Sequence, residues 1–202
     1  VGDGGMIQGL AGGLANADGV VFQERALFRV TYVGPPLIFS FDQLEGGRGT
    51  PIPGSIAQLG GLVFYIGEDG FYAFDGASSQ PIGAEILDKT FFDDLDQTYS
   101  ARISSAVDPI NKIVYWSYPG ASNVAGLPNR VLAFNWSLKR WSLIEISSEL
   151  IFRAGTFGYN LDGAAITGYN VDSSPFGPDS RFWAGGKSIL AGFSAAHKLG
   201  FF

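Results

Sequence analysis

The sequence has no cysteine and a single histidine, His197, among its 202 residues. The lack of cysteine excludes a disulfide framework, a thiolate metal site and a thiol nucleophile. One imidazole does not build a metal site, and no Gly-x-Ser-x-Gly turn, which would hold a nucleophilic serine, is present. We therefore expect no catalytic residue, no metal ligand and no cofactor, and we interpret His197 as a strand residue near the chain end.

Charge is also scarce. Charged residues make up 16% of the chain, and 13 basic residues against 19 acidic ones leave a net charge of -6. This sign gives no overall attraction for phosphate backbones or anionic membranes, and Lys139-Arg140 is the one adjacent basic pair. No run approaches the ~20 apolar residues of a membrane span, and the N-terminus lacks the order of a signal peptide. We expect neither a membrane partner nor sequence-specific nucleic acid binding.

Glycine and aromatic residues are abundant instead. The chain has 29 glycines and 14% aromatic residues, whereas a disordered chain is poor in aromatics and rich in charge. Many reversals around a bulky core are typical of an all-β protein. The glycine-rich start and the apolar end, residues 200–202, lead us to expect a piece of a longer polypeptide, because natural termini seldom lie within an apolar run.

One hairpin organises the prediction. Two short apolar runs, 62–66 and 71–74, are joined by Gly67-Glu68-Asp69-Gly70, in which Asp and Gly are expected for conformational reasons alone. Both runs are apolar at successive positions, so both faces of this hairpin are expected to be buried. Sheets packed face to face on two neighbours, such as the stacked blades of a β-propeller, have this property.

A second copy of the unit follows 60 residues later. Residues 71–75 align with 131–135, and four strands joined by hairpins are expected between about 102 and 148, close to the ~40 to 50 residues of one propeller blade. Further strands are expected at 20–22, 26–33 and 37–41. The predicted fold is thus all-β: a β-propeller, or part of one, of antiparallel four-stranded blades. The expected blades lie within 19–202, at about 19–54, 55–84, 102–148 and 150–202, after a glycine-rich arm or loop at 1–18.

A short helix between two blades is predicted at 86–95, where apolar residues recur at helical offsets without glycine. Asp93, Asp94 and Asp96 there resemble a divalent-cation cluster, but apolar residues interleave with them and no calcium-loop spacing is present. We interpret these acids as a solvated helix face. After residue 149 we expect strands at 150–154, 164–169, 181–183 and 188–193, with a loop at 172–179.

Three further motifs favour structural roles. Gly2-Asp3-Gly4-Gly5 has the composition of a phosphate-binding loop but neither the preceding strand nor the following helix. Asn135-Trp136-Ser137 fits the glycosylation triplet without a secretory signal to support it. The four tryptophans could line a sugar-stacking surface, but such residues more often anchor packing between blades; they are Trp116, Trp136, Trp141 and Trp183.

Several segments, taken in order, resemble a family of tailed-bacteriophage β-propeller virion proteins, of the tail-hub or packaged-DNA-stabilisation type found at the head-to-tail junction. The segments that carry this resemblance are 2–9, 22–26, 32–36, 53–58, 68–72, 106–109 and 197–202. The resemblance implies a non-enzymatic structural protein in a symmetric ring of the virion neck or tail, assembled in the host cytoplasm. It also implies partners among the connector, tail tube or tail fibres, and a role in stabilising packaged DNA or anchoring fibres.

Two other classes stay open at this point. Residues 70–75 are similar to the blade motif of quinoprotein dehydrogenases, although the motif is not repeated with its tryptophan in each unit. Gly60-Gly61 with Trp141 is similar to kelch-type propellers, which bind proteins or, in one variant, glycans. For the virion role, we expect the contacts with neighbouring proteins in the loops at 45–53, 119–129 and 172–179, since loops vary freely on a rigid scaffold.

Overall fold

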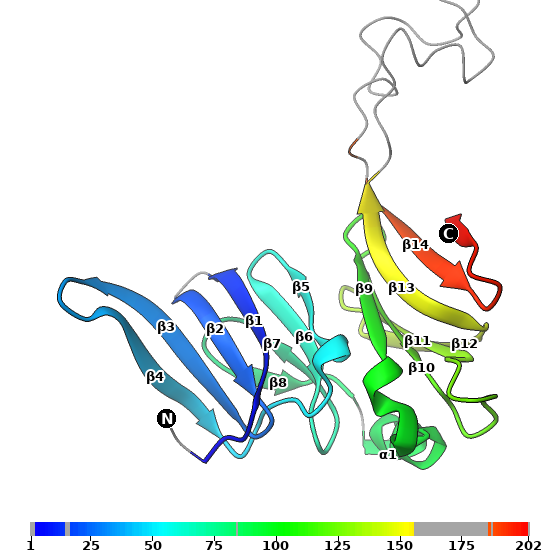
Figure 1. Cartoon of the computed structure of the whole chain (residues 1–202), viewed down its shortest axis with the longest axis horizontal. Coiled ribbons are helices and arrows are strands. Elements are labelled where there is room, and N and C mark those ends of the chain that lie inside the picture. The colour runs from blue at the N-terminus through cyan, green and yellow to red at the C-terminus, as the bar shows by residue number, and fades with distance from the viewer. Residues whose placement is uncertain (1–2, 15–16, 84, 156–185, 187, 202) are drawn as a thin grey trace, which may run out of the picture.

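The computed structural model describes residues 3–14, 17–83, 85–155, 186 and 188–201. Within these residues the chain forms four antiparallel sheets and one α-helix, so the predicted all-β class is confirmed (Figure 1). No helix in the described ranges has the length and apolar character needed to cross a bilayer. The predicted strands 164–169 and 181–183 and the predicted loop 172–179 lie outside the described residues.

Each sheet is a simple meander of consecutive strands. Sheet 1 is β1–β4, sheet 2 is β5–β8, sheet 3 is β9–β12 and sheet 4 is β13–β15, so three of the four have the predicted four strands. The bounds are β1 Ile7–Leu14, β2 Ala17–Gln23, β3 Ala26–Gly34, β4 Ile38–Gly46, β5 Ala57–Leu59, β6 Leu62–Ile66, β7 Phe71–Phe74, β8 Ser79–Pro81, β9 Ser104–Asp108, β10 Ile113–Tyr118, β11 Arg130–Asn135, β12 Arg140–Glu145, β13 Ser148–Gly155, β14 Ser188–Ser194 and β15 Leu199–Phe201.

Sheet 2 is buried on both faces, as its hairpin predicts. β6 and β7 occupy the predicted residues, and Phe64 is 1% exposed while Tyr65 is fully buried. Successive residues point to opposite faces, so one face of the sheet meets sheet 1 and the other meets sheet 3. Val63 and Tyr65 belong to the core shared with sheet 1, whereas Phe64 and Ile66 belong to the core shared with sheet 3.

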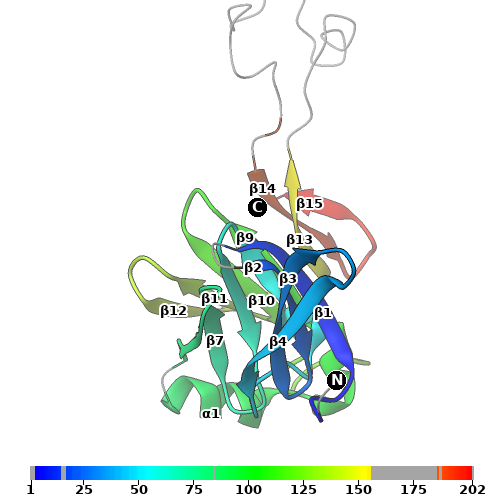
Figure 2. The ribbon, with the colours of Figure 1, turned by 90° about the vertical axis from the view of Figure 1, so that its left-hand side faces the viewer.

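The sheets therefore follow one another face to face (Figures 1 and 2). Aromatic rings fill both interfaces of sheet 2: the Phe22 and Tyr65 ring centroids are 5.4 Å apart on one side, and those of Phe71 and Trp116 are 5.0 Å apart on the other. Sheet 4 packs on the opposite face of sheet 3, where the backbone N–H of Ile151 donates to Ser104 Oγ at 3.1 Å. Edge-to-face and tilted pairs of this kind stabilise a core beyond the area they bury.

The N-terminal arm predicted at 1–18 is wrong for residues 7–14, which form the strand β1. β1 pairs with β2 through Leu10↔Val21 and Ala11↔Val20. One of the glycines that suggested a loop has a packing role, because a Cβ on Gly9 would overlap Ile56 Cδ1. Glycine in a strand commonly marks such a close approach.

The remaining strand predictions are confirmed with shifted ends. β2 and β3 contain the predicted strands. β4 begins one residue later than predicted, at Ile38, and continues to Gly46, which pairs with Ala26, into the range predicted as a loop. The predicted interblade helix is α1 (Glu85–Asp94), which leads from sheet 2 to sheet 3 through a 3-10 segment, η2 (Gln97–Arg102). Its Phe91 is 1% exposed, and the Phe91 and Phe71 ring centroids are 4.9 Å apart, so the helix closes one end of the core.

A 3-10 turn, η1 (Pro53–Ser55), precedes β5 of sheet 2, and the backbone at its end accepts hydrogen bonds from side chains of sheet 3. Trp116 Nε1 donates to the carbonyl oxygen of Ser55 at 2.9 Å, and Ser105 Oγ donates to that of Ile56 at 3.2 Å. A Cβ on Gly54 would overlap the carbonyl oxygen of Ile103. Because that obstacle is backbone, only glycine fits here without separating the two sheets.

We therefore expect Gly54→Ala to destabilise the fold by about 2–3 kcal/mol, the upper part of the range for overpacking. Urea unfolding followed by tryptophan fluorescence measures the change. Gly61→Ala is the matched control, since nothing lies within 4 Å of the position that the added methyl group would take, and it should stay within about 0.5 kcal/mol of the parent. Equal stability of the two variants would contradict the close approach of sheets 2 and 3.

Candidate functional site

The outward face of sheet 1 is apolar across its strands. Val20, Phe22 and Leu27 point into the core shared with sheet 2. Residues one position away in the strands point to the opposite side, and cross-strand pairs share a face. The register therefore gathers seven apolar residues on the outward face, which we call end face 1: Leu10, Val21, Phe28, Val30, Tyr32, Phe39 and Phe41.

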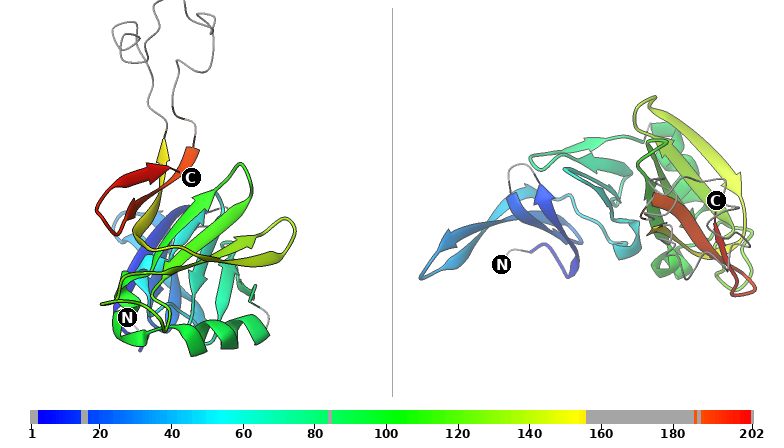
Figure 3. Two further views of the ribbon diagram at one scale, coloured as in Figure 1. Left: turned by 90° about the vertical axis from the view of Figure 1, so that its right-hand side faces the viewer. Right: turned by 90° about the horizontal axis from the view of Figure 1, so that it is seen from above.

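Four of the seven members of end face 1 are exposed, whereas Phe28 and Val30 are half-buried and Val21 is buried. Leu10 is 73% exposed and Phe41 63%, and the Tyr32 and Phe39 rings, with centroids 5.8 Å apart, sit at the far end of the β3–β4 hairpin. Single exposed apolar residues are ordinary, whereas a contiguous apolar face marks an interaction surface. The face lies at one end of the sheet series (Figure 3).

Sheet 4 ends the series with a second apolar face. The pairs Leu150↔Phe193↔Leu199 and Phe152↔Ala191↔Phe201 lie opposite Ile151, which faces sheet 3. Among the described residues Leu199 is 49% and Phe201 56% exposed, and the Phe152 and Phe193 rings stack with centroids 5.7 Å apart. We call this surface end face 4; its apolar members are Leu150, Phe152, Phe193, Leu199 and Phe201.

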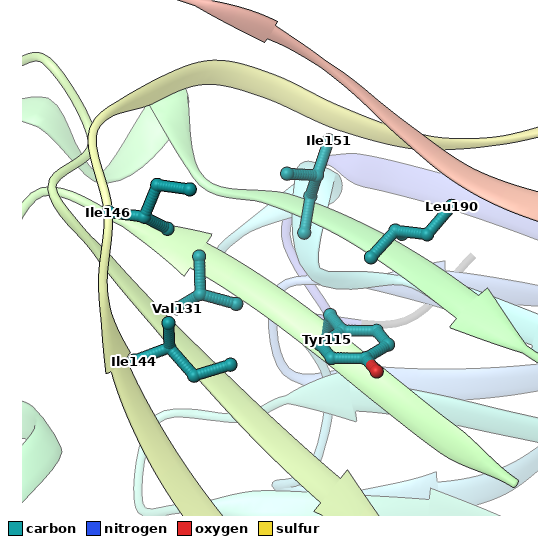
Figure 4. A pocket seen from close by; sticks show the side chains of 6 residues that line it. All are labelled: Tyr115, Val131, Ile144, Ile146, Ile151 and Leu190. Atoms are coloured by element: carbon teal, nitrogen blue, oxygen red, sulfur yellow. The ribbon is translucent and has the colours of Figure 1, made fainter. Parts of the chain in front are cut away.

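An apolar cavity of about 180 Å³ lies between sheets 3 and 4 (Figure 4). Its lining side chains come from both sheets and from the chain between them: Tyr115, Val131, Ile144, Ile146, Ile151 and Leu190. The Tyr115 hydroxyl is the one side-chain polar group of this lining, and burial, with Asp108 nearby, raises the pKa of Tyr115. The cavity has the chemistry of loosely packed core and offers no acid–base pair.

The loop at 119–129 is tied down by polar side chains. Asp94, at the end of α1, accepts from the Tyr118 hydroxyl at 3.0 Å and pairs with Arg130 Nε at 3.0 Å, so it clamps both ends of the loop. Burial, followed by the Asp94 charge, raises the pKa of Tyr118, which keeps the hydroxyl protonated as a donor. Within the loop, Asn129 Oδ1 accepts from Gly120 N at 2.8 Å.

Asp96 holds the centre of the same loop. Its Oδ2 accepts from Asn123 Nδ2 at 2.9 Å, and its Oδ1 caps η2 by accepting from Thr98 N at 3.1 Å. The hydrogen bond from Asn123 is the main cause that lowers the pKa of Asp96. Asn123 Oδ1 in turn accepts from Gly126 N at 2.7 Å. The loop is therefore an ordered surface feature, and its Val124 is 79% exposed.

The three acids considered for a cation site thus have different surroundings. Asp93 is exposed, as a solvated face requires, but Asp94 and Asp96 are half-buried and bonded to loop 119–129, so the solvated-face prediction is wrong for them. In the described ranges no three acidic or histidine side chains come together in a way that would hold a metal ion.

His197 lies in the turn between β14 and β15, with a φ of 58°, rather than in a strand as predicted. Its Nδ1 is 2.8 Å from Glu149 Oε2 at the surface. Asp69 in the β6–β7 turn accepts from the Tyr72 hydroxyl at 2.8 Å, and burial, with this bond, raises the pKa of Tyr72 to about 12. These contacts hold turns in place.

Three of the four tryptophans pack between sheets 2 and 3, as the anchoring interpretation predicts; Trp183 lies outside the described residues. Trp116 is fully buried, Trp141 stacks on it with centroids 5.8 Å apart, and Trp136 packs on Phe64 at 5.5 Å. Asn135 Oδ1 accepts from Ser137 N and Leu138 N in the β11–β12 turn. Gly4 is buried, and its carbonyl oxygen accepts from Arg25 N at 2.9 Å, so this segment packs on the β2–β3 reversal.

Sequence reasoning missed the two end faces. The signal was present in part, because Val30, Tyr32, Phe39 and Phe41 alternate with polar residues along two adjacent runs. The register that places them on one side, and the position of sheet 1 at the end of the series, depend on pairing across the sheet.

No protein-family model matches this chain, and no curated protein matches it. Among solved structures, the crystal structure of the hemopexin fold protein CP4 from cow pea is similar at 10% sequence identity. The match covers 98% of this chain and 92% of that one, with a TM-score of 0.34.

Proposed function

We propose that this chain is a non-enzymatic structural protein of a tailed-bacteriophage virion, located in the neck or tail, where it forms or caps the head-to-tail connector or tail hub. The ordered set of segments that resembles this family supports the proposal. In that setting it would stabilise packaged DNA or anchor tail fibres, with other virion proteins as partners.

The observation that carries this proposal is the sheet series, in which sheets 2 and 3 are covered on both faces. Four consecutive meanders packed face to face are what blades of a β-propeller require, and we assign the fold to that architecture on this ground. Sheets wedged between neighbours resist deformation, which suits a component that holds pressurised DNA behind it.

Several resembling segments are joints of this scaffold. Residues 53–58 connect sheets 2 and 3, residues 68–72 form the turn and the first residues of β7, and residues 22–26 form the reversal that packs on Gly4. Such residues maintain a rigid frame, and the loops are left to make specific contacts. Loop 119–129 is the best-supported contact loop, because it is ordered by Asp94 and Asp96 and presents Val124 to solvent.

The anchoring of this loop is tested with Asp94→Ala. The variant loses the bonds to Tyr118 and Arg130, and we expect the fold to lose about 1–3 kcal/mol, with faster amide hydrogen exchange in residues 119–129. The exposed neighbour Asp93→Ala is the matched control and should change neither measurement. Unchanged exchange in Asp94→Ala would show that the loop is ordered by other contacts.

The function itself is tested by replacing residues 120–128 with a short glycine–serine turn in the phage genome. We expect the variant chain to fold, with a far-UV circular dichroism spectrum like that of the parent, while particle assembly falls at least tenfold by plaque count and electron microscopy. Normal particles would contradict the contact role of the loop, and a chain that mass spectrometry does not find in purified particles would contradict the virion role altogether.

A further inference from the structure

The two apolar end faces point in opposite directions along the sheet series. We call the side of a sheet that points toward the next sheet in chain order its forward face, and the opposite side its rear face. In each internal contact the forward face of one sheet covers the rear face of the next: sheet 1 on sheet 2, sheet 2 on sheet 3 and sheet 3 on sheet 4. Among the described residues, no further sheet covers end face 1, which is a rear face, or end face 4, which is a forward face. A rear face and a forward face are the two surfaces that meet in every contact of the series.

We infer that end face 4 of one copy of this chain packs on end face 1 of a second copy, and that the second copy returns the same contact. The result is a closed, two-fold ring of eight sheets. A head-to-tail contact gives a closed ring when the rotation between copies permits it, and a filament otherwise. Propellers commonly have about four to eight blades, so two copies fit this range and three do not.

The chemistry of the two faces suits this occupant. Both consist of aliphatic and aromatic side chains on β-strands, like the buried faces of sheet 2. Their exposed members include Phe41 at 63% and Phe201 at 56%. Within the chain, apolar faces of this composition pack on the next sheet of the series. A contact between end face 4 and end face 1 of two copies would be an interface of the same kind.

The area is also adequate. With about 3.3 Å per residue and about 4.8 Å between strands, the strands β13, β14 and β15, of 8, 7 and 3 residues, present a flat area of about 285 Å². Two such contacts per copy give about 570 Å², close to the ~600 Å² per partner at the lower end of standard stable interfaces. A single contact would give half of that, which is why closure is favoured over an open pair.

The first test is the oligomeric state of the full chain by analytical ultracentrifugation. We expect a two-copy species, and we expect Phe41→Glu on end face 1 and Phe201→Glu on end face 4 each to raise the dissociation constant at least about 100-fold, because a carboxylate would be buried without a partner. Leu138→Glu is the control, since Leu138 is 66% exposed in the β11–β12 turn, away from both faces. A monomeric parent chain at micromolar concentration would overturn the inference.

Mixing the variants tests the direction of the contact. Phe41→Glu keeps end face 4 and Phe201→Glu keeps end face 1, so a mixed pair has one intact contact. A mixture should therefore associate more tightly than either variant alone, although more weakly than the parent chain. If Phe201→Glu alone stays a dimer, end face 1 pairs with itself and the head-to-tail arrangement is wrong.

A cross-linking experiment avoids variants that fail to fold. The chain has no cysteine, so introduced thiols are unique. A short bismaleimide should link Phe41→Cys copies to Leu199→Cys copies and should not link Phe41→Cys copies to one another; the reverse result overturns the inference. This inference goes beyond the virion role, because a ring in solution is measured without any particle, and a chain absent from virions could still form it.

Discussion

The burial of both faces of sheet 2 is the constraint on which the rest of the structure depends. A β-strand that is covered on one side leaves its alternate residues to water, but Phe64 and Tyr65 are adjacent and both are shielded. Each needs a separate apolar partner, and these partners belong to two different sheets. Each of those sheets has a second face of its own. On sheet 3 this face packs on sheet 4, and the series ends at the apolar end faces of sheets 1 and 4.

Apolar packing between sheets does not by itself set their relative position, since burial is non-directional. Polar joints supply this information. Trp116 bonded to the backbone of Ser55 fixes sheet 3 against sheet 2. Between sheets 1 and 2, Ser79 is the joint: its N–H donates to Glu45 Oε1 at 2.5 Å, and its Oγ is 2.7 Å from the Tyr65 hydroxyl. Burial raises the pKa of Tyr65, so this hydroxyl stays a donor. A buried joint that lost one partner would leave the other unsatisfied, which opposes slippage of the sheets.

The sequence predicts best where local pattern and tertiary packing agree. β6 and β7 occur at the predicted residues because their apolar runs end at turn residues. β1 escapes prediction because its glycines are typical of a loop, whereas its strand conformation depends on pairing with β2. The local pattern around Asp94 and Asp96 indicates a solvated face, and this prediction is wrong because their partners, Arg130 and Asn123, are distant in sequence. The end faces escape prediction for the same reason: strand alternation is visible locally, but which side of a sheet meets another sheet is not.

In a fold of this kind, the residues that pack between the sheets differ from those that tolerate substitution. Positions inside the series carry packing on both sides, so substitution there costs stability. The turns between strands do not carry this packing, and loop 119–129 shows how one of them is ordered. Asp94 of α1 and Asp96 before η2 bind the loop from outside, and Asn123 and Asn129 bind from within it. The exposed side chain of Val124 can vary without disturbing these bonds. Specificity for a neighbouring protein is therefore expected to lie at such exposed loop residues, on a scaffold whose sheets are constrained by each other.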